Sequence, residues 1–375
     1  MELSIDRTSL LNGLALVQGI VERRNTVPIL GHVMLEAENG SLNLSATDLE
    51  VGVRTALACR SNGGGTITLN ARKIFEIVRE AGGEEVKLKS LENDWVELRC
   101  GRARFKMMGL DPRSFPAMPH KTEAKSDKTV KAEISVAPGL LATMIDKTIF
   151  AVSPDEARYN LTGVYIESPA PGSARMVATD GHRLAMIDRE VSGFSMQGGV
   201  IIPRKGLVEL RRLLDRTEEG DVQIQIDNQI AYIKRSSTEV SMRLVEGEFP
   251  DYKGVIPKQS RYQIGVERDT LTAAIKRAAI FSNERYHGVK LGLSAATLTV
   301  SSTSPEMGEA SETIDVDFKG EEFAIGFNAT YLLQMLGVVE SGSDVVLGLT
   351  DEVSPGVITT PSDSQFTYVV MPMRL

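Results

Sequence analysis

The chain has 375 residues, which is too long for one ordinary hydrophobic core and predicts two or three domains. Its 42% hydrophobic and 25% charged residues indicate a globular protein, and a formal net charge of -8 argues against indiscriminate coating of nucleic acid or of anionic membranes. Two cysteines are too few for a disulfide framework, and the N-terminus resembles neither a signal peptide nor a membrane span, so we expect a cytoplasmic protein.

The first third of the chain predicts a helix, a strand hairpin, a second helix and a further strand pair. Apolar residues at helical spacing between Leu10 and Val17 predict an amphipathic helix. From Leu30, "LGHVMLEAENGSLNLSATDLEV" alternates apolar and polar residues around a turn, which is typical of two paired strands. From Asn70, "NARKIFEIVREA" returns to helical spacing behind a possible N-cap, and "EVKLKSLENDWVELRC" then alternates again.

The same order of elements recurs twice. The second and third copies have helical spacing near Leu140 and Leu271, hairpins in "LTGVYIESPAPGSARMVATDGHRL" and "YHGVKLGLSAATLTVSSTS", second helices in "PRKGLVELRRLLDR" and "NATYLLQMLGVVES", and strand pairs in "DVQIQIDNQIAYIKR" and "DVVLGLTDEVSPGVIT". We therefore expect an α+β fold of three equivalent domains, each with two helices packed on antiparallel sheets. The expected domains are residues 1–125, 129–251 and 252–375, with Pro-containing linkers at 112–131 and 247–261.

The segment "ATDGHRLA" from Ala178 gathers Asp180, His182 and Arg183 around one glycine, as a catalytic cluster would. Asp180, however, occupies the place of Asp48 in the first copy, where neither His nor Arg follows. Asp-Gly after a strand is a turn signal, so we interpret the aspartate as part of the architecture.

Catalytic and cofactor motifs are missing from the sequence. It has no phosphate-binding loop, no dinucleotide-binding turn, no zinc-peptidase motif and no nucleophile elbow. The four histidines, His32, His120, His182 and His287, occupy unrelated places in their copies. We expect no cofactor, no metal site and no enzymatic activity.

Basic residues gather on the predicted helices of this acidic chain: Arg23, Arg24, Arg72, Lys73, Arg204, Lys205, Arg211, Arg212, Lys276 and Arg277. A single helix of this kind is usually a solvated face, but recurrence on equivalent helices favours one basic surface that attracts a phosphate backbone. A domain of this size is about 36 Å across, so three in a ring leave a hole of about 6 Å and six leave about 36 Å. Only the larger ring admits duplex DNA, which is about 20 Å wide. One chain is then half of a ring that a two-fold homodimer closes.

Two segments of opposite charge could form that junction. "CGRARFK" at residues 100–106 predicts a basic edge strand, and "SPEMGEASE" at 304–312 is acidic. Pairing them would satisfy both an exposed edge and its charge, although two separately solvated segments are a comparable alternative.

The repeat, "ATDGHRLA", "VIIPRKGLVEL" at 200–210, "FPDY" at 249–252 and the terminal "YVVMPMRL" together resemble the bacterial replicative sliding clamps, the beta subunits of DNA polymerase III, over the whole chain. The resemblance implies three DNA-clamp domains in a head-to-tail dimeric ring that slides on duplex DNA without sequence preference and tethers the replicative polymerase. A closed ring without a nucleotide site also requires an ATP-driven loader that acts in trans. No membrane partner is expected.

The resemblance also implies site residues. A pocket between the second and third domains would accept short apolar peptides of polymerases, clamp-loader subunits and repair proteins. Its residues would be Arg158, Leu161, Thr179, Gly181, His182, Arg183, Leu184, Pro250, Val255, Val369, Val370, Met371, Pro372, Met373, Arg374 and Leu375. The DNA contacts would be Arg24, Arg72, Tyr159 and Lys205, and the candidate dimer-interface residues are Lys73, Arg102, Arg104, Ile280, Phe281, Glu306 and Glu309.

Two other classes of function stay open at this point. A hydrolase that uses Asp180 and His182 would lose turnover on His182→Ala while DNA retention persisted. A DNA-binding regulator that does not enclose the duplex would show sequence preference and a steep salt dependence in equilibrium binding.

Overall fold

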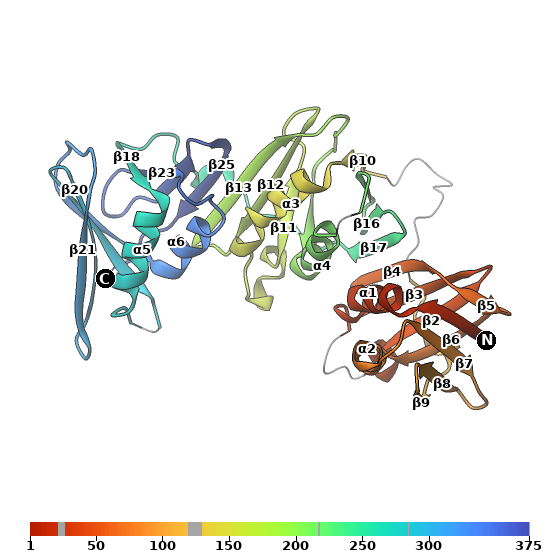
Figure 1. The fold of residues 1–375 in the computed structure, drawn as a ribbon. Helices are drawn as coiled ribbons and strands as arrows, with labels where there is room; N and C mark the ends of the chain where they lie inside the picture. Colours follow the sequence, from red (N-terminus) through yellow and green to blue (C-terminus); the bar gives the residue numbers. More distant parts are fainter. Residues whose placement is uncertain (22–26, 119–129, 217, 284, 375) are drawn as a thin grey trace. The chain divides into compact units, whose positions relative to one another are not determined.

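The computed structural model describes residues 1–21, 27–118, 130–216, 218–283 and 285–374. Each third of the sequence repeats one order of elements: a short strand, a helix, a group of strands, a second helix and a three-stranded meander (Figure 1). The predicted α+β class and the threefold repeat are therefore confirmed. Among the described residues, no helix is both long and apolar enough to cross a membrane.

The elements of the three copies have the following bounds. The first copy contains β1 (Glu2–Asp6), α1 (Arg7–Gln18), β2 (His32–Glu38), β3 (Ser41–Thr47), β4 (Val51–Ala58), β5 (Arg60–Asn62), β6 (Gly65–Asn70), α2 (Ala71–Glu80), β7 (Glu85–Ser90), β8 (Trp95–Cys100) and β9 (Ala103–Met108). The second contains β10 (Ala132–Val136), α3 (Pro138–Asp146), β11 (Gly163–Glu167), β12 (Ser173–Thr179), β13 (Arg183–Glu190), β14 (Gly199–Pro203), α4 (Arg204–Leu214), β15 (Val222–Ile226), β16 (Ile230–Arg235) and β17 (Thr238–Arg243). The third contains β18 (Tyr262–Glu267), α5 (Arg268–Ala279), β19 (Gly288–Ser294), β20 (Thr297–Ser304), β21 (Gly308–Asp315), β22 (Phe323–Asn328), α6 (Ala329–Leu336), β23 (Asp344–Leu349), β24 (Gly356–Thr360) and β25 (Asp363–Val370). Short 3-10 helices lie at η1 (Pro28–Gly31), η2 (Pro112–Ser114), η3 (Ile149–Ala151), η4 (Glu156–Leu161) and η5 (Lys253–Val255).

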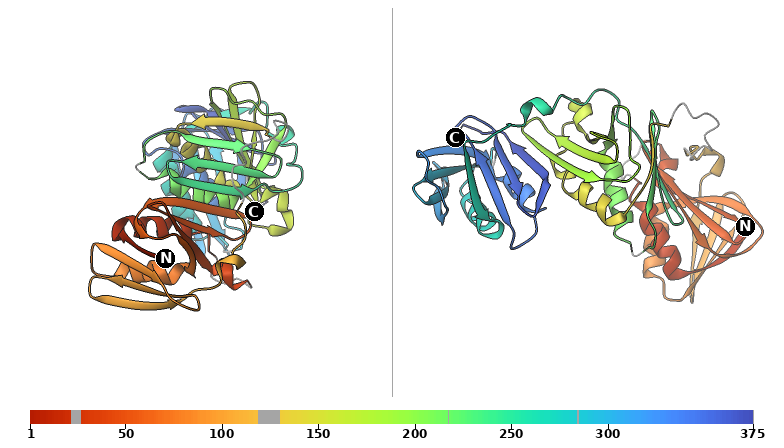
Figure 2. Two further views of the ribbon diagram at one scale, coloured as in Figure 1. Left: turned by 90° about the vertical axis from the view of Figure 1, so that its right-hand side faces the viewer. Right: turned by 90° about the horizontal axis from the view of Figure 1, so that it is seen from above.

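Two of the four sheets are shared between neighbouring copies. The first shared sheet has the order β10-β15-β16-β17-β4-β3-β2-β6, and its strands lie side by side in Figure 2. The second has the order β14-β11-β12-β13-β25-β24-β23-β18. The joining pairs, β17 with β4 and β13 with β25, are antiparallel. The other two sheets, β5-β1-β7-β8-β9 and β21-β20-β19-β22, each belong to one copy.

The chain forms two compact units. Unit 1 comprises Met1–Leu141 and Ile202–Leu244, and unit 2 comprises Ala142–Ile201 and Val245–Leu375. The second copy contributes to both units because its two meanders complete the two shared sheets. The domain limits 1–125, 129–251 and 252–375 stay a prediction, since these units follow the sheets and not the sequence repeats.

Helix starts follow the capping residues of the sequence. Asn70 Oδ1 accepts a hydrogen bond of 3.0 Å from the Lys73 amide at the start of α2, and Asn328 Oδ1 accepts one of 2.8 Å from Thr330 at the start of α6. Pro203 precedes α4 without a side-chain cap. The helices bury their apolar faces against the sheets, as Leu10 and Leu14 of α1 do with 0% exposure.

Candidate functional site

The segment from Thr179 to Arg183 forms a tight turn between β12 and β13. Asp180 Oδ1 accepts hydrogen bonds from the amides of His182 at 2.9 Å and Arg183 at 3.1 Å, and Thr179 Oγ1 donates to the Arg183 carbonyl at 2.6 Å. Gly181 takes the left-handed backbone angle that this turn needs, with φ of 86°. The aspartate therefore acts as a turn residue, as the repeat predicts.

The first copy contains the same turn with other residues. Asp48 Oδ1 accepts from the amides of Glu50 at 2.9 Å and Val51 at 2.7 Å, and Thr47 Oγ1 donates to the Val51 carbonyl at 3.0 Å. Leu49 replaces the glycine and takes a φ of 80°. One hydrogen-bond pattern thus recurs without His or Arg.

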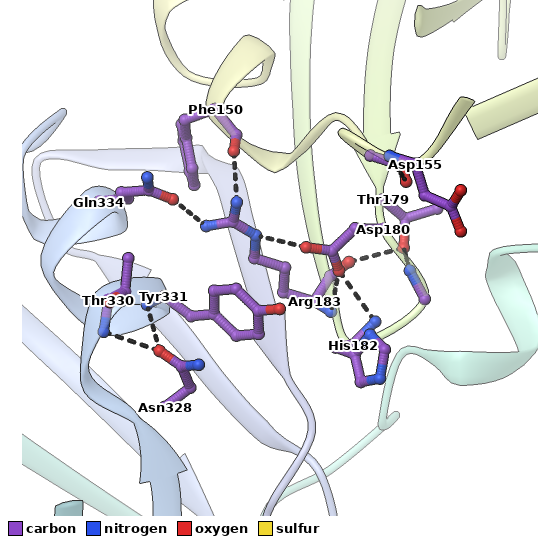
Figure 3. A network of polar contacts seen from close by, with 12 residues as sticks. Phe150, Asp155, Thr179, Asp180, His182, Arg183, Asn328, Thr330, Tyr331 and Gln334 are labelled. Carbon is purple, nitrogen blue, oxygen red and sulfur yellow. Dashed lines mark hydrogen bonds and ion pairs between the residues drawn. The ribbon is translucent and has the colours of Figure 1, made fainter. Parts of the chain in front are cut away.

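Arg183 lies at the centre of a buried polar network (Figure 3). Its side chain is 6% exposed; Nε donates to Asp180 Oδ2 at 3.1 Å and Nη2 donates to the Phe150 carbonyl at 2.5 Å. Nη1 donates to Gln334 Oε1 of α6, and the guanidinium lies 4.3 Å from the centre of the Tyr331 ring. Arg183 therefore joins β13 to η3 and α6, and each of its three guanidinium nitrogens already donates a hydrogen bond.

An apolar pocket of about 250 Å³ opens beside this turn in unit 2. Nine predicted pocket residues line it: Leu161, Thr179, Gly181, Arg183, Leu184, Pro250, Val255, Val369 and Met371. Asp251 and Tyr252 also line it, although the sequence prediction did not include them. The "FPDY" motif contains both residues and could have indicated them.

Tyr252 is 5% exposed and packs beneath this pocket in a cluster with Leu184 and Val369. Its hydroxyl donates to Glu167 and accepts from Arg175 Nη1 at 3.1 Å. Burial is the main reason that the pKa of this phenol is raised, and the hydroxyl stays protonated at neutral pH. The ring is thereby fixed in place below the pocket.

The other described residues of the pocket prediction do not line it. Arg158 is half exposed, and its Nη1 donates to the Asp180 carbonyl at 3.1 Å. His182 is exposed, and Val370 is 1% exposed inside the sheet. Pro372, Met373 and Arg374 continue past β25, where the Met373 amide donates to the Gly326 carbonyl at 2.9 Å; Leu375 lies outside the described residues.

Two of the predicted DNA contacts have acidic partners. Arg72 Nε lies 2.9 Å from Glu76 Oε1, and the Lys205 ammonium pairs with Asp48. Tyr159 is 58% exposed, while Arg24 lies outside the described residues. Ion pairing lowers the net attraction that each cation exerts on a phosphate.

The predicted dimer-interface residues lie in and around two edge strands. In the sheet orders, β9 neighbours β8 alone and β21 neighbours β20 alone among the described strands. Arg102 lies in the turn before β9, Arg104 lies on β9 paired with Glu97, Glu306 lies before β21 and Glu309 lies on β21. Ile280 is 69% exposed after α5, next to Phe281, and Lys73 pairs with Glu76 at 2.9 Å.

Comparisons with known proteins cover all three copies. The family models of the DNA polymerase III beta subunit match residues 1–119 for the N-terminal domain, 135–251 for the central domain and 253–374 for the C-terminal domain. The chain is 36% identical to a beta sliding clamp of Caulobacter vibrioides and 37% identical to one of Proteus mirabilis, with both chains covered completely in each case. A crystal structure of the Caulobacter crescentus beta sliding clamp matches with a TM-score of 0.92 at 35% identity, covering 100% of this chain and 99% of that one. The DNA polymerase III subunit beta of Pseudomonas aeruginosa gives the same TM-score and identity, with 100% of both chains covered.

Proposed function

The chain belongs to the DNA polymerase III beta subunit family, the beta sliding clamps, and we propose that its own repeats dictate how two copies close the ring. As a DNA sliding clamp it encircles duplex DNA and tethers the replicative polymerase for processive synthesis. The residues that we propose for each part of this function are supported by the described contacts.

The sheet joins carry the argument for closure. Each copy has a first meander (β2–β4, β11–β13 or β19–β21) and a second meander (β7–β9, β15–β17 or β23–β25). The first meander of copy one joins the second meander of copy two through β4 and β17. The first meander of copy two joins the second meander of copy three through β13 and β25. The same rule pairs β21 of copy three with β9 of copy one. Both strands are edges, so the pairing takes place between two chains, and a two-fold axis forms two such junctions.

The repeat also gives the register of that junction. Ser241 of β17 faces Gly52 of β4, and Val369 of β25 faces Leu184 of β13. Gly52, Leu184 and Glu309 are equivalent because each faces the threonine of the preceding strand, as Glu309 faces Thr303. In the hairpin before β9 Cys100 pairs with Ala103, and in the hairpin before β17 Arg235 pairs with Thr238. Lys106 lies three residues after Ala103 and Ser241 lies three residues after Thr238, so Lys106 and Ser241 are equivalent. We therefore place Lys106 of one copy opposite Glu309 of its partner.

Weak contacts suit a ring that must slide. Arg72 and Lys205 keep acidic partners, so each offers a phosphate only part of its charge. Many such partial attractions can centre a duplex without fixing one register, and topology then provides the retention. Arg24, Arg72, Tyr159 and Lys205 stay our candidates for these contacts.

The pocket of unit 2 is proposed as the docking site for clients. Leu161, Leu184, Pro250, Val369 and Met371 give it apolar walls, which suits a short apolar peptide from a polymerase, a clamp loader or a repair protein. Arg158 and His182 adjoin the turn that lines it, and we propose that they and Arg374 contact the polar groups of such a peptide.

The clamp role is proposed to need no chemistry from this chain. Asp180 uses its carboxylate for the turn and for Arg183, so a hydrolase that relies on Asp180 and His182 would lack a free base. Loading then falls to a separate ATP-driven partner. We place the protein in the cytoplasm, where such a replication partner acts on the chromosome.

A covalently closed ring tests the proposal. The pair Lys106→Cys with Glu309→Cys, in a Cys59→Ser and Cys100→Ala background, should form interchain disulfides and twice the 40.8 kDa mass of one chain under denaturing conditions. After loading and oxidation on a nicked circular DNA, the ring should survive high salt and be lost when the circle is cut. Equal retention on linear DNA, or a monomer at every concentration, would reject the ring.

A further inference from the structure

A separate cavity of about 300 Å³ lies in unit 1, on the first shared sheet. The strand register sets Glu133, Gln225, Tyr232, Ser241 and Gly52 in one row across β10, β15, β16, β17 and β4. The first four of these residues line the cavity. Their side chains point to one face because they face one another across successive strands.

Gln225 lines this cavity, and its side chain has an unused acceptor. The residue is 8% exposed, and its Oε1 has no hydrogen-bond partner among the described residues. A buried acceptor without a donor destabilises the fold. A ligand that brings a donor would remove this destabilisation.

The fold itself does not require an amide at this position. Val86, Val222 and Val345 lie at equivalent places near the start of the last three strands of each copy, and three residues later the sequence has Lys89, Gln225 and Gly348. The same strand therefore forms whether this position carries a cation, an amide or no side chain. The buried amide is a feature of the second copy alone.

The cavity has an apolar wall and a neutral rim. A Cβ placed on Gly52 would lie 2.7 Å from Met118 Cε and 2.9 Å from Ser241 Oγ, so the Met118 methyl packs against the end of the row. On the rim Lys234 pairs with Glu239 at 3.0 Å, and Arg54 lies 3.3 Å from Glu36. The paired charges favour an uncharged ligand.

We propose that this cavity is a second ligand site, which takes the amide group of a short extended peptide. The amide N–H donates to Gln225 Oε1, the amide carbonyl accepts from the hydroxyl of Tyr232 or Ser241, and an aliphatic side chain packs on Met118. An amide matches this wall better than a cation or an acid because it supplies a donor and an acceptor without net charge. The site is additional to the clamp function and does not depend on the pocket of Val369.

Methyl NMR with labelled methionine tests the site on the full-length protein. The probe is N-acetyl-leucinamide at millimolar concentration, a size that fits the cavity. The Met118 signal should shift and saturate, whereas the Met371 signal reports the pocket of unit 2 separately. The analogue N-acetyl-N-methyl-leucine dimethylamide keeps both carbonyls but has no amide N–H, and it should shift the Met118 signal several-fold less.

Substitution of the acceptor decides the outcome. Gln225→Leu should abolish the Met118 shift, and its melting temperature should equal or exceed that of the parent because an unpaired buried acceptor is removed. Gln225→Met serves the same purpose if the leucine variant folds poorly. Gln263→Leu, on exposed β18, is the matched control and should bind as the parent does. An unmoved Met118 signal, or an equal shift in the Gln225 variants, would overturn the proposal.

Discussion

Arg183 holds three segments of unit 2 together at the scale of a single residue. Its guanidinium contacts Asp180, the Phe150 carbonyl and Gln334; the contact with Asp180 is buried and the other two are partly buried. In the sequence analysis this arginine is only one of the pocket residues that the resemblance implies. That assignment missed the network because Phe150 and Gln334 lie far from Arg183 in the chain.

Arg183→Ala should strongly destabilise the protein. It would leave the Asp180 carboxylate buried without its cation, a change that costs about 3–5 kcal/mol. Urea unfolding at fixed protein concentration measures the loss. Arg158→Ala is the control, because this half-exposed arginine donates to the carbonyl of the same aspartate and should cost under about 1 kcal/mol. Similar losses in the two variants would contradict the role given to Arg183.

Val255 tests the proposed docking pocket without disturbing its core. The side chain is 40% exposed at the pocket wall, so a polar substitution is compatible with folding. Val255→Asp should lower the affinity for a short apolar client peptide by on the order of tenfold, since an ionised group would face apolar surface. Fluorescence anisotropy of a labelled peptide measures the change. Val27→Asp, 46% exposed in unit 1, should leave the affinity unchanged, and a parallel loss there would point to a general effect.

At the scale of elements, the helices and hairpins were predictable and the joins between them were not. Leu10, Leu14 and Val17 show helical spacing within one short segment, and the hairpins show alternation around a turn, so local pattern suffices. The short strands β1, β10 and β18 were missed because five or six residues give too little periodicity. The pairing of β17 with β4 joins residues far apart in the chain, and no local pattern specifies such a partner.

The start of α5 should make stability depend on pH in the acid range. Asp269 Oδ2 accepts from Ser341 Oγ at 2.6 Å and from the Gly342 amide at 2.9 Å, and Arg268 also donates to this carboxylate. These hydrogen bonds, of which the one from Ser341 has the largest effect, lower the pKa of Asp269 from 3.8 to about 2. Because the folded pKa is depressed, the stabilisation is present above pH 3.8 and is lost as the pH falls toward 2.

Asp269→Asn should therefore be less stable than the parent at pH 5 and equally stable near pH 2. Urea unfolding across this pH range measures the difference between the two proteins. Asp315→Asn, at the end of β21, is a control whose carboxylate makes no such bonds to the described residues, and it should follow the parent at each pH. A difference for Asp269→Asn that stayed constant down to pH 2 would mean that the carboxylate charge is not the cause.

At the scale of the whole molecule, the repeat determines which strand edges a single chain leaves unpaired. Three copies offer three equivalent joins, and one chain makes two of them. The third join leaves β9 and β21 as edges, and exposed edges readily pair with another chain. The charges agree with that pairing, since β9 carries Arg104 and Lys106 while β21 carries Glu309 and Glu312. Glu312 already pairs with Arg277 of its own chain, which leaves Glu309 for the partner.

A charge exchange tests both the junction and its register. Lys106→Glu would set two carboxylates opposite each other, where like charges cost up to about 1 kcal/mol at each junction. Because the ring has two junctions, the dissociation constant of the dimer should rise by roughly tenfold or more, as sedimentation measures. Adding Glu309→Lys to the same chain restores opposite charges and should recover dimerisation. Lys87→Glu, on the interior strand β7, controls for the change in net charge and should leave the dimer intact. A dimer insensitive to Lys106→Glu, or a double variant that stays monomeric, would show that the two strands do not meet in this register.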